Sequence, residues 1–396
     1  MIDFDFHNEC TGCRACADVC PKACISFRED RDGFVMPVVD KAACIDCQRC
    51  EKVCPALMGG REGKESKEGD RKVEKGAHTC YAAYHTDATI RHEGSSGSVF
   101  YALAEGIIAE GGVVYGAELC EDLQLRHTRA TTLEGVRRQM KSKYIQSNTQ
   151  GVYKQVLEDV KNGKKVLFVG TPCQCTALHN MTPERLRDNL LIADFICHGV
   201  PSQSLFNQSL ALYEQQHDCK VVDFSFREKT DKELRNAKVV YETNDGTRHE
   251  VVSSLDELPF CYAYFYHYSV RNSCYACRLR GTERASDLTL GDFWGLDKLR
   301  PETSKDFTKG YSSIIVNSER GRNALPKHIA LEEIPEGIDY IIKRNHAYIK
   351  ADTKDRMRSV FFWLLCHKGF AFTAKHMLSL HPTVVDRLWQ AVVRKF

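Results

Sequence analysis

Two runs of cysteine near the start of the chain have the spacing of metal ligands. In each run, four cysteines are separated by two, two and three residues, and a proline follows at once. The runs are Cys10, Cys13, Cys16 and Cys20, then Cys44, Cys47, Cys50 and Cys54. Thiolates at this spacing hold two 4Fe–4S clusters, in which the fourth cysteine of each run binds the cluster of the other. The pattern therefore assigns Cys54 to the first cluster and Cys20 to the second.

Zinc is the alternative for paired cysteines, because C-x2-C also suits a tetrahedral zinc site. Zinc needs only four ligands in two separated pairs, whereas here a run of four is repeated. The run with its proline is that of bacterial-type ferredoxins, and residues 1–58 are predicted to form such a 2×4Fe–4S domain. Cys24 lies outside the ligand pattern and is expected to pack beside a cluster.

Two single cysteines each follow a predicted buried strand. Cys173 comes after the strand at residues 166–169, and Cys197 after the strand at 190–196. If these strands are parallel neighbours, about 4.8 Å apart, both thiols lie at the carboxyl edge of the sheet, where open α/β sheets bind ligands. The two thiols could then share one cluster.

Cys274 and Cys277 form a further C-x2-C pair and complete a candidate set of four ligands for a third 4Fe–4S cluster. Cys175 is the rival ligand to Cys173 from the same loop. The cysteines without ligand spacing are expected to be structural: Cys80, Cys120, Cys219, Cys261 and Cys366.

Four short motifs carry a family resemblance. They are Gly-Thr-Pro-Cys-Gln at 170–174, Cys-His-Gly-Val-Pro at 197–201, Cys-x2-Cys-Arg at 274–278 and Gly-Asp-Phe-Trp-Gly at 291–295. In this order they resemble the beta subunits of coenzyme F420-reducing hydrogenases and F420-linked formate dehydrogenases, and the core of 7-hydroxymethyl chlorophyll a reductase and its relatives. Members are flavoproteins with iron–sulfur clusters, and some carry an N-terminal ferredoxin module. The resemblance implies FAD, which spacing and composition alone do not indicate.

Two segments match the flavin-region motifs of that family. The first precedes a helix predicted to begin near Val99, where backbone N–H groups and the helix N-terminus favour a pyrophosphate. In the second, Lys143 would stabilise negative charge, Tyr144 would stack and Gln146 would bond the ring edge. Capping or strand roles are the ordinary alternative. The expected cofactor-binding residues are Ser95, Ser96, Gly97, Ser98, Ser142, Lys143, Tyr144, Gln146, Ser147, Gly170, Thr171 and Pro172.

The predicted function couples these cofactors. A flavin exchanges two electrons as hydride, whereas an iron–sulfur cluster passes single electrons, so the chain is predicted to be an oxidoreductase that links the two. Catalytic roles fall to Lys143 and to His198, the candidate proton donor beside Cys197. The expected partners are a redox partner (ferredoxin, coenzyme F420 or another subunit) and an organic substrate. The alternative is an electron-transfer subunit of a larger complex with no substrate of its own.

Composition limits the class of protein. A chain of 396 residues is expected to form two or three domains. Its 19 cysteines, with no apolar segment at the N-terminus, indicate reduced thiols and a cytoplasmic location. No apolar run reaches the ~18 residues of a membrane helix, and a net charge of +2 gives no support to nucleic-acid binding.

The fold class is predicted to be α+β: a dicluster ferredoxin fold, an α/β flavin-binding core with an antiparallel extension, and a helical C-terminal tail. Helices at 99–110, 152–161 and 175–189 alternate with strands at 113–119, 166–169 and 190–196, which favours a covered parallel sheet. Asn244-Asp245-Gly246 predicts a hairpin. The predicted segments are 1–58 ferredoxin, 59–76 charged linker, 77–163 flavin loops, 164–325 third cluster, and 326–396 basic tail. The tail is expected to pack on the core, with contact to an anionic membrane as the alternative.

Overall fold

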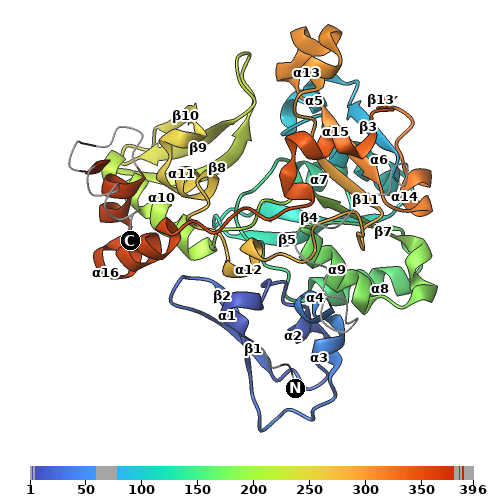
Figure 1. Ribbon diagram of the computed structural model, residues 1–396, viewed down its shortest axis with the longest axis horizontal. Coiled ribbons are helices and arrows are strands. Elements are labelled where there is room, and N and C mark those ends of the chain that lie inside the picture. The colour runs from blue at the N-terminus through green and yellow to red at the C-terminus, as the bar shows by residue number, and fades with distance from the viewer. Residues whose placement is uncertain (1, 3–4, 59–77, 379–382, 384–385, 388–396) are drawn as a thin grey trace.

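The structure is a computed structural model that describes residues 2, 5–58, 78–378, 383 and 386–387 (Figure 1). The predicted linker at 59–76 and residues 388–396 of the predicted basic tail lie outside these residues. Within the described part of the chain, no helix combines the length and the apolar character that crossing a membrane requires.

The N-terminal module repeats one small unit twice. Each cysteine loop leads into a short helix, and each of these helices is preceded by a residue in the left-handed region, Arg14 (φ 61) and Gln48 (φ 58). The elements are α1 (Phe6–Glu9), α2 (Ala15–Val19), β1 (Ile25–Glu29), β2 (Val35–Val39), α3 (Arg49–Val53) and α4 (Pro55–Met58), with β1 and β2 antiparallel. The repeat brings the two cysteine runs to the same module.

Among the described residues, the largest sheet has eight strands in the order β13-β3-β12-β11-β7-β6-β4-β5. The four strands β4, β6, β7 and β11 are parallel neighbours, as expected for 166–169 and 190–196. The bounds are β3 (Cys80–Tyr84), β4 (Val113–Leu119), β5 (Leu125–Ala130), β6 (Val166–Val169), β7 (Leu190–Phe195), β11 (Leu288–Asp292), β12 (Ser312–Val316) and β13 (Ala330–Glu333).

Helices cover both faces of this sheet because its strands are apolar on both sides. Val114, Leu167 and Leu191 pack with α6 (Val99–Ala109), near α5 (Ala88–Glu93) and α7 (Leu133–Gln139). Their sequence neighbours face α8 (Val152–Lys161) and α9 (Pro172–Met181) on the other side. The chain also contains the shorter helices α12 (Asn272–Tyr275), α13 (Leu296–Leu299), η3 (Pro301–Lys309), α14 (Glu319–Asn323), α15 (Gly337–Arg344) and η4 (His346–Tyr348).

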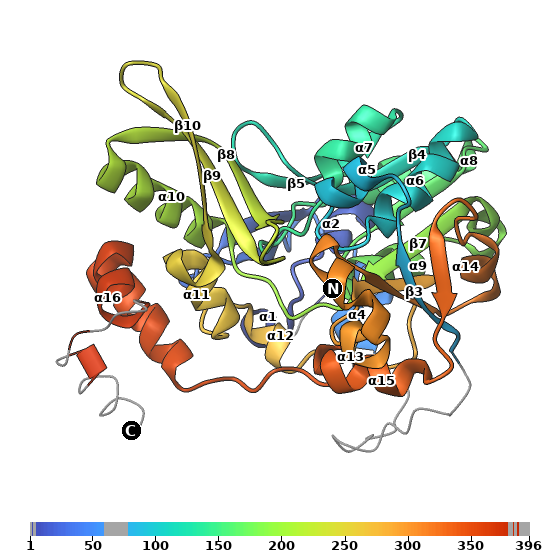
Figure 2. The same cartoon turned by 90° about the horizontal axis from the view of Figure 1, so that it is seen from above.

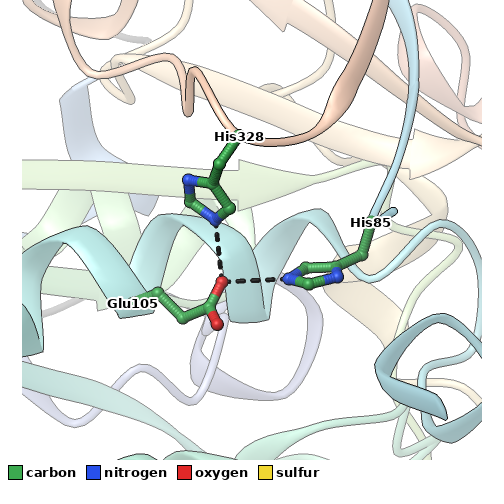
Figure 3. Close-up of side chains that lie close together, drawn as sticks. All are labelled: His85, Glu105 and His328. Atoms are coloured by element: carbon green, nitrogen blue, oxygen red, sulfur yellow. Dashed lines mark hydrogen bonds and ion pairs between the residues drawn. The ribbon is translucent and has the colours of Figure 1, made fainter. Parts of the chain in front are cut away.

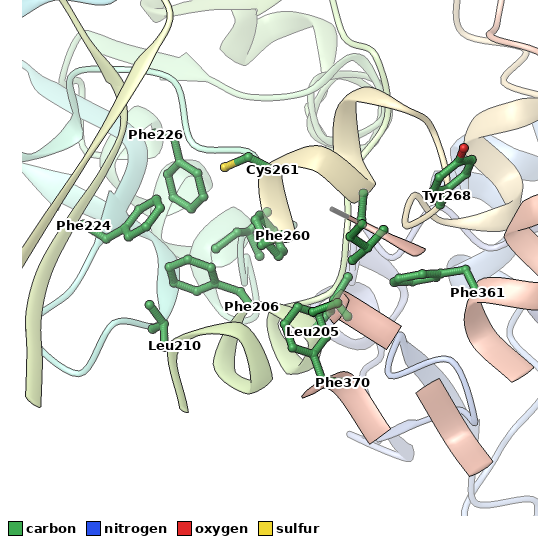
Figure 4. Packing of buried hydrophobic residues seen from close by; sticks show 14 of the residues in the cluster. Leu205, Phe206, Leu210, Phe224, Phe226, Phe260, Cys261, Tyr268, Phe361 and Phe370 are labelled. Atoms are coloured by element: carbon green, nitrogen blue, oxygen red, sulfur yellow. The ribbon is translucent and has the colours of Figure 1, made fainter. Parts of the chain in front are cut away.

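A second, antiparallel sheet lies to one side of the first (Figure 2). It contains β8 (Cys219–Glu228), β9 (Asn236–Thr243) and β10 (Arg248–Ser254), and the predicted hairpin at Asn244-Asp245-Gly246 joins the last two. It packs with α10 (Gln203–His217), η2 (Leu255–Glu257), α11 (Pro259–Phe265) and α16 (Met357–Met377). Phenylalanine rings fill this core (Figure 4), with centroids of Phe206, Phe224 and Phe226 about 5 Å apart.

Two predicted elements differ from the structure. The helix expected at 175–189 is α9 followed by a separate 3₁₀ turn, η1 (Glu184–Asn189). Pro183 lies at the break, because proline disfavours helical geometry in the preceding residue and lacks an N–H. The tail at 326–396 is not helical throughout. Residues 330–333 form β13, which pairs with β3, and Gly369 (φ 79) interrupts α16.

The N-terminal module is packed into the main body of the chain. Cys13, Ala15 and Val53 belong to the same hydrophobic cluster as the residues under α8 and α9. Polar contacts reinforce the interface: the buried Arg358 of α16 donates to Asp32 at 3.3 Å. The Asp18 carboxylate accepts the N–H groups of Gly151 (2.7 Å) and Tyr153 (3.2 Å), and so caps α8 from outside.

Replacing Asp18 by alanine is expected to lower the free energy of unfolding by about 2 kcal/mol, because two N–H groups at a helix N-terminus lose a charged acceptor. Urea unfolding of the full chain measures the change. Asp18→Asn keeps one acceptor and should lose less. The exposed Asp231→Ala serves as control and should change little. Equal effects of Asp18→Ala and Asp231→Ala would contradict this role.

Candidate functional site

The two N-terminal cysteine runs exchange their last members. The Cys16 thiol interacts electrostatically most strongly with Cys13, Cys10 and Cys54, and less with Cys50. Burial, and then the Cys54 thiol, raises the pKa of Cys13 to about 12. The other set lines one small cavity: Cys20, Cys44, Cys47 and Cys50, together with Cys24. The structure thus groups Cys54 with the first run and Cys20 with the second.

Cys24 packs directly against the second set, with its Sγ 3.4 Å from that of Cys20. Burial alone would raise the pKa of Cys20, but backbone N–H groups, including that of Cys24, outweigh it and lower the value. The hydrogen bond with Cys20 raises the pKa of Cys24 to about 11. The thiol of Cys20 therefore ionises more readily than that of Cys24.

The second-half cysteines meet at the carboxyl edge of the large sheet. Cys173 lies in the first turn of α9, directly after β6, Cys197 follows β7, and the C-x2-C pair lies at α12. Burial, followed by the thiols of Cys13, Cys197 and Cys277, raises the pKa of Cys173 well above its ordinary value. Burial and then Cys197 and Cys277 raise the pKa of Cys274 to about 12. Buried thiols that oppose each other's ionisation suit a bound metal, which stabilises thiolates.

Cys175, the rival of Cys173, turns away from this group. It is 1% exposed and belongs to the core under α8 and α9. Its Sγ contacts the carbonyl oxygens of Gly170 (3.6 Å) and Ala193 (3.5 Å). Cys175 lies two positions after Cys173 in α9 and therefore points to a different side of the helix. Cys173 is the thiol that faces Cys197, Cys274 and Cys277.

A cavity of about 490 Å³ opens beside this thiol group, within the size range of cofactor sites. Cys197 lines it, as do the ends of β4, β6, β7 and β11. Nine of the twelve expected cofactor-binding residues line it: Ser95, Ser96, Ser98, Ser142, Lys143, Tyr144, Ser147, Gly170 and Thr171. Pro172, the first residue of α9, is not among the residues that line the cavity.

Gly97 and Gln146 do not face the cavity, contrary to expectation. Gly97 donates its N–H to Ser312 Oγ (2.9 Å), so this N–H is not available to a pyrophosphate. Gln146 points to the N-terminal module, where its Nε2 donates to Thr11 O (2.7 Å). The expected bond of Gln146 to a ring edge is therefore replaced by a contact between modules.

Lys143 reaches the cavity, but its ammonium group is fully occupied. It donates to the carbonyl oxygens of Ala117, Gln139 and Met140. An ammonium has three hydrogens, so none remains for a cofactor. Lys143 therefore holds its loop in place, and its charge acts on the cavity only through space.

Arg227 joins the two predicted flavin segments and was missed by sequence reasoning. It is 4% exposed and pairs with Asp292 of the Gly-Asp-Phe-Trp-Gly motif at 2.9 Å. It also donates to Ser95 O (3.0 Å) and to the Tyr144 hydroxyl (3.2 Å). The strand β8 carries several other charged residues, so its sequence did not single out Arg227 or its partner.

Buried hydrogen bonds also organise the inner end of the cavity. His127 stacks on Phe168 with ring centroids 5.2 Å apart, and its Nε2 lies 3.0 Å from Val169 O. Its Nδ1 accepts from Ser147 Oγ (2.9 Å), which in turn accepts from Gln174 Nε2 (2.9 Å). Burial lowers the pKa of His127 to about 4, so the ring is neutral and its tautomer is set.

His198 lies with two other histidines around one carboxylate at the edge of the cavity. His198 Nδ1, His267 Nε2 and His346 Nε2 are 3.8, 3.6 and 2.7 Å from the oxygens of Asp352. All three rings line the cavity. Burial alone would raise the pKa of Asp352, but the neighbouring His198 and His346 hold it well below its usual range. Asp352 thus carries a negative charge among the histidines.

A separate trio of His85, Glu105 and His328 has metal-ligating side chains (Figure 3). Glu105 Oε2 is 3.0 Å from His85 Nε2 and 2.8 Å from His328 Nε2. The Nδ1 of His85 accepts the N–H of Asp87 (3.1 Å), so its proton is on Nε2. A metal at Nε2 would displace that proton, and Nδ1 could not take it up while it accepts the N–H of Asp87. The trio is therefore a hydrogen-bonded tie between β3, α6 and the segment before β13.

Comparison with known proteins identifies the class. Residues 163–336 match the C terminus of the beta subunit of coenzyme F420 hydrogenase/dehydrogenase, and residues 9–58 match the 4Fe–4S dicluster domain. The chain is therefore an iron–sulfur protein that combines a dicluster module with a segment similar to this oxidoreductase family. A solved structure of the F420-reducing NiFe hydrogenase complex from Methanosarcina barkeri, made with xenon, contains a similar chain: 18% identity, 68% of this chain, 88% of that chain, TM-score 0.44. A search of the curated proteins gave no match.

His127 predicts a pH dependence of stability. Because its pKa is about 4 in the folded chain and about 6.5 in an unfolded one, the unfolded chain binds more protons between these values. Stability therefore falls as the pH decreases from about 6.5 to 4. His127→Gln removes the group, so the difference in unfolding free energy between variant and parent should shrink over this window. The exposed His92→Gln should leave the pH profile of the parent unchanged; identical profiles for both variants would contradict the assignment.

Proposed function

We propose that the chain is an iron–sulfur flavoprotein oxidoreductase that links one-electron transfer in its N-terminal module to two-electron transfer in the cavity. One observation carries the proposal. The thiol of Cys13, in the first N-terminal set, interacts with that of Cys173, and Cys197 of the same second group lines the cavity. Bound clusters would supply single-electron transfer, and FAD would supply hydride exchange.

The chemistry of the residues supports both kinds of cofactor. Cys173, Cys197, Cys274 and Cys277 offer four thiolates for a third 4Fe–4S cluster. In the cavity, the side-chain oxygen of Gln139 is buried and has no hydrogen-bond partner among the described residues, so it can accept from a bound ligand. The serines of the two flavin segments and Tyr144 would hold FAD, and Arg227 would fix both segments.

The histidines at the edge of the cavity would serve the substrate. Two-electron reduction of an organic substrate or a coenzyme F420-like carrier also consumes a proton. His198 lines the cavity beside Cys197 and lies within ion-pair distance of Asp352. His346 is more exposed than Asp352, so it would connect this carboxylate with solvent.

The second candidate is an electron-transfer subunit of a larger complex without its own substrate. The family match favours it, because that family is described as a beta subunit. Affinity purification without air separates the two. A catalytic partner that copurifies in fixed ratio, with no turnover by the isolated chain, supports the subunit role. Turnover by the isolated chain with reduced ferredoxin, coenzyme F420 or nicotinamides supports the enzyme.

Replacing Cys274 by serine is expected to remove one cluster and leave the other two. The iron content should fall from about twelve to about eight per chain. The matched control is Cys175→Ser, which changes a core thiol of the same sheet edge and should keep about twelve. Loss of iron in the control alone, or in neither variant, would exclude the third ligand set. A parent protein without flavin in its visible spectrum would exclude the flavoprotein.

Replacing His198 by glutamine is expected to slow transfer to the two-electron carrier by roughly 10²–10⁴-fold, the range for loss of a general acid. Iron and flavin content should stay at the parent values, and reduction of the flavin by the clusters should keep its rate. His249→Gln on the exposed strand β10 is the control. An unchanged transfer rate in the His198 variant would remove this residue from proton delivery.

A further inference from the structure

Arg271 spans the boundary between the N-terminal module and the third thiol group. It lies three residues before Cys274 and is 1% exposed. Its guanidinium crosses to the N-terminal module, where it donates to Cys10 O (3.2 Å) and Val35 O (3.0 Å). It also donates to Gln146 Oε1 (2.9 Å) and lies 4.8 Å from the ring centre of Phe34.

The charge of Arg271 has no acidic partner. All of its partners are neutral, and among residues 5–58 and 78–378 no carboxylate lies within ion-pair distance of it. Three other deeply buried arginines are each paired with a carboxylate: Arg358 with Asp32, Arg227 with Asp292, and Arg284 with Asp194. Arg91 instead donates to Gly310 O and lies over the rings of Tyr84 and Tyr311. Because an unpaired buried charge is strongly unfavourable, Arg271 needs an anion that the side chains do not supply.

The first cysteine loop brings a second cation to the same place. Arg14, between Cys13 and Cys16, has a lowered pKa because of burial and then the charge of Arg271. The loop approaches closely because of Gly12 (φ +69), where a Cβ would lie 2.7 Å from Arg271 Nη2. Two nearby guanidinium groups repel unless negative charge lies next to them. Thiolate-bound clusters carry such charge.

We propose that Arg271 is the electrostatic coupling element between two clusters: the one held by Cys10, Cys13, Cys16 and Cys54, and the one held by Cys173, Cys197, Cys274 and Cys277. Its charge is balanced by the anionic clusters on either side and raises the reduction potential of both, because the added electron is more stable near a cation. Among the described residues, none of the hydrogen bonds of Arg271 goes to the second N-terminal set, beside Cys24. Arg271 is a positioning residue, and the inference rests on the third cluster of the proposed function.

The experiment measures the reduction potential of each cluster in the full chain by anaerobic titration followed with electron paramagnetic resonance. In Arg271→Gln, two of the three clusters should become harder to reduce by at least about tenfold in equilibrium constant, which is about 59 mV for one electron. The third should stay at the parent value. Arg271→Lys keeps the charge without the planar fork and should retain all three potentials. The exposed Arg248→Gln on β10 makes the same charge change elsewhere and should have no effect.

Three results would overturn the inference: unchanged potentials in Arg271→Gln, an equal shift of all three clusters, or the same shift in Arg271→Lys, which would assign the effect to hydrogen-bond geometry. Iron content separates this test from that of the proposed function. About twelve irons in the parent and about eight in Cys274→Ser support the third cluster, whatever the Arg271 variants show. About eight in the parent would exclude the third cluster, and the coupling with it.

Discussion

The arrangement of the molecule depends on how the main body holds two peptide carbonyls of the first cysteine loop. Thr149 Oγ1 (2.7 Å) and the Tyr153 hydroxyl (2.9 Å) both donate to Cys13 O. Ser273 Oγ (2.9 Å) and Arg271 donate to Cys10 O. Each such bond contributes about 1 kcal/mol, and loss of a buried partner costs about 1–3 kcal/mol. The cluster loop is therefore fixed by side chains at or next to α8 and α12, which belong to the main body of the chain.

That attachment holds the N-terminal module beside the thiol group at the edge of the cavity. Parallel strands bring the ends of β6 and β7 to one edge, so Cys173 and Cys197 lie together there. The residues that follow these strands turn either towards the N-terminal module or towards the cavity. Residues 142–147 divide in the same way: Tyr144 faces the cavity, and Gln146 faces Thr11. The loop at 142–147 thus contacts both the N-terminal module and the proposed flavin site.

Sequence reasoning succeeded where chemistry is local. The spacing of the cysteine runs, the strand ends before Cys173 and Cys197, and the alternation of helix and strand all depend on neighbouring residues. Parallel pairing of 166–169 with 190–196 followed from the short helical connection between them. The helix expected at 175–189 is divided at Pro183. This proline was a local signal for the break, although the apolar pattern continued across it.

The residues that sequence reasoning missed act across long separations. Arg227 and Asp292 are 65 residues apart, and Arg271 and Cys10 are 261 apart. Each of these arginines is buried, where a charge is unfavourable unless a partner comes from elsewhere. For Arg227 the partner is a carboxylate in the Gly-Asp-Phe-Trp-Gly motif. For Arg271 no side chain among the described residues provides one, and this difference between two buried arginines in the same fold points to the clusters as its counter-charge.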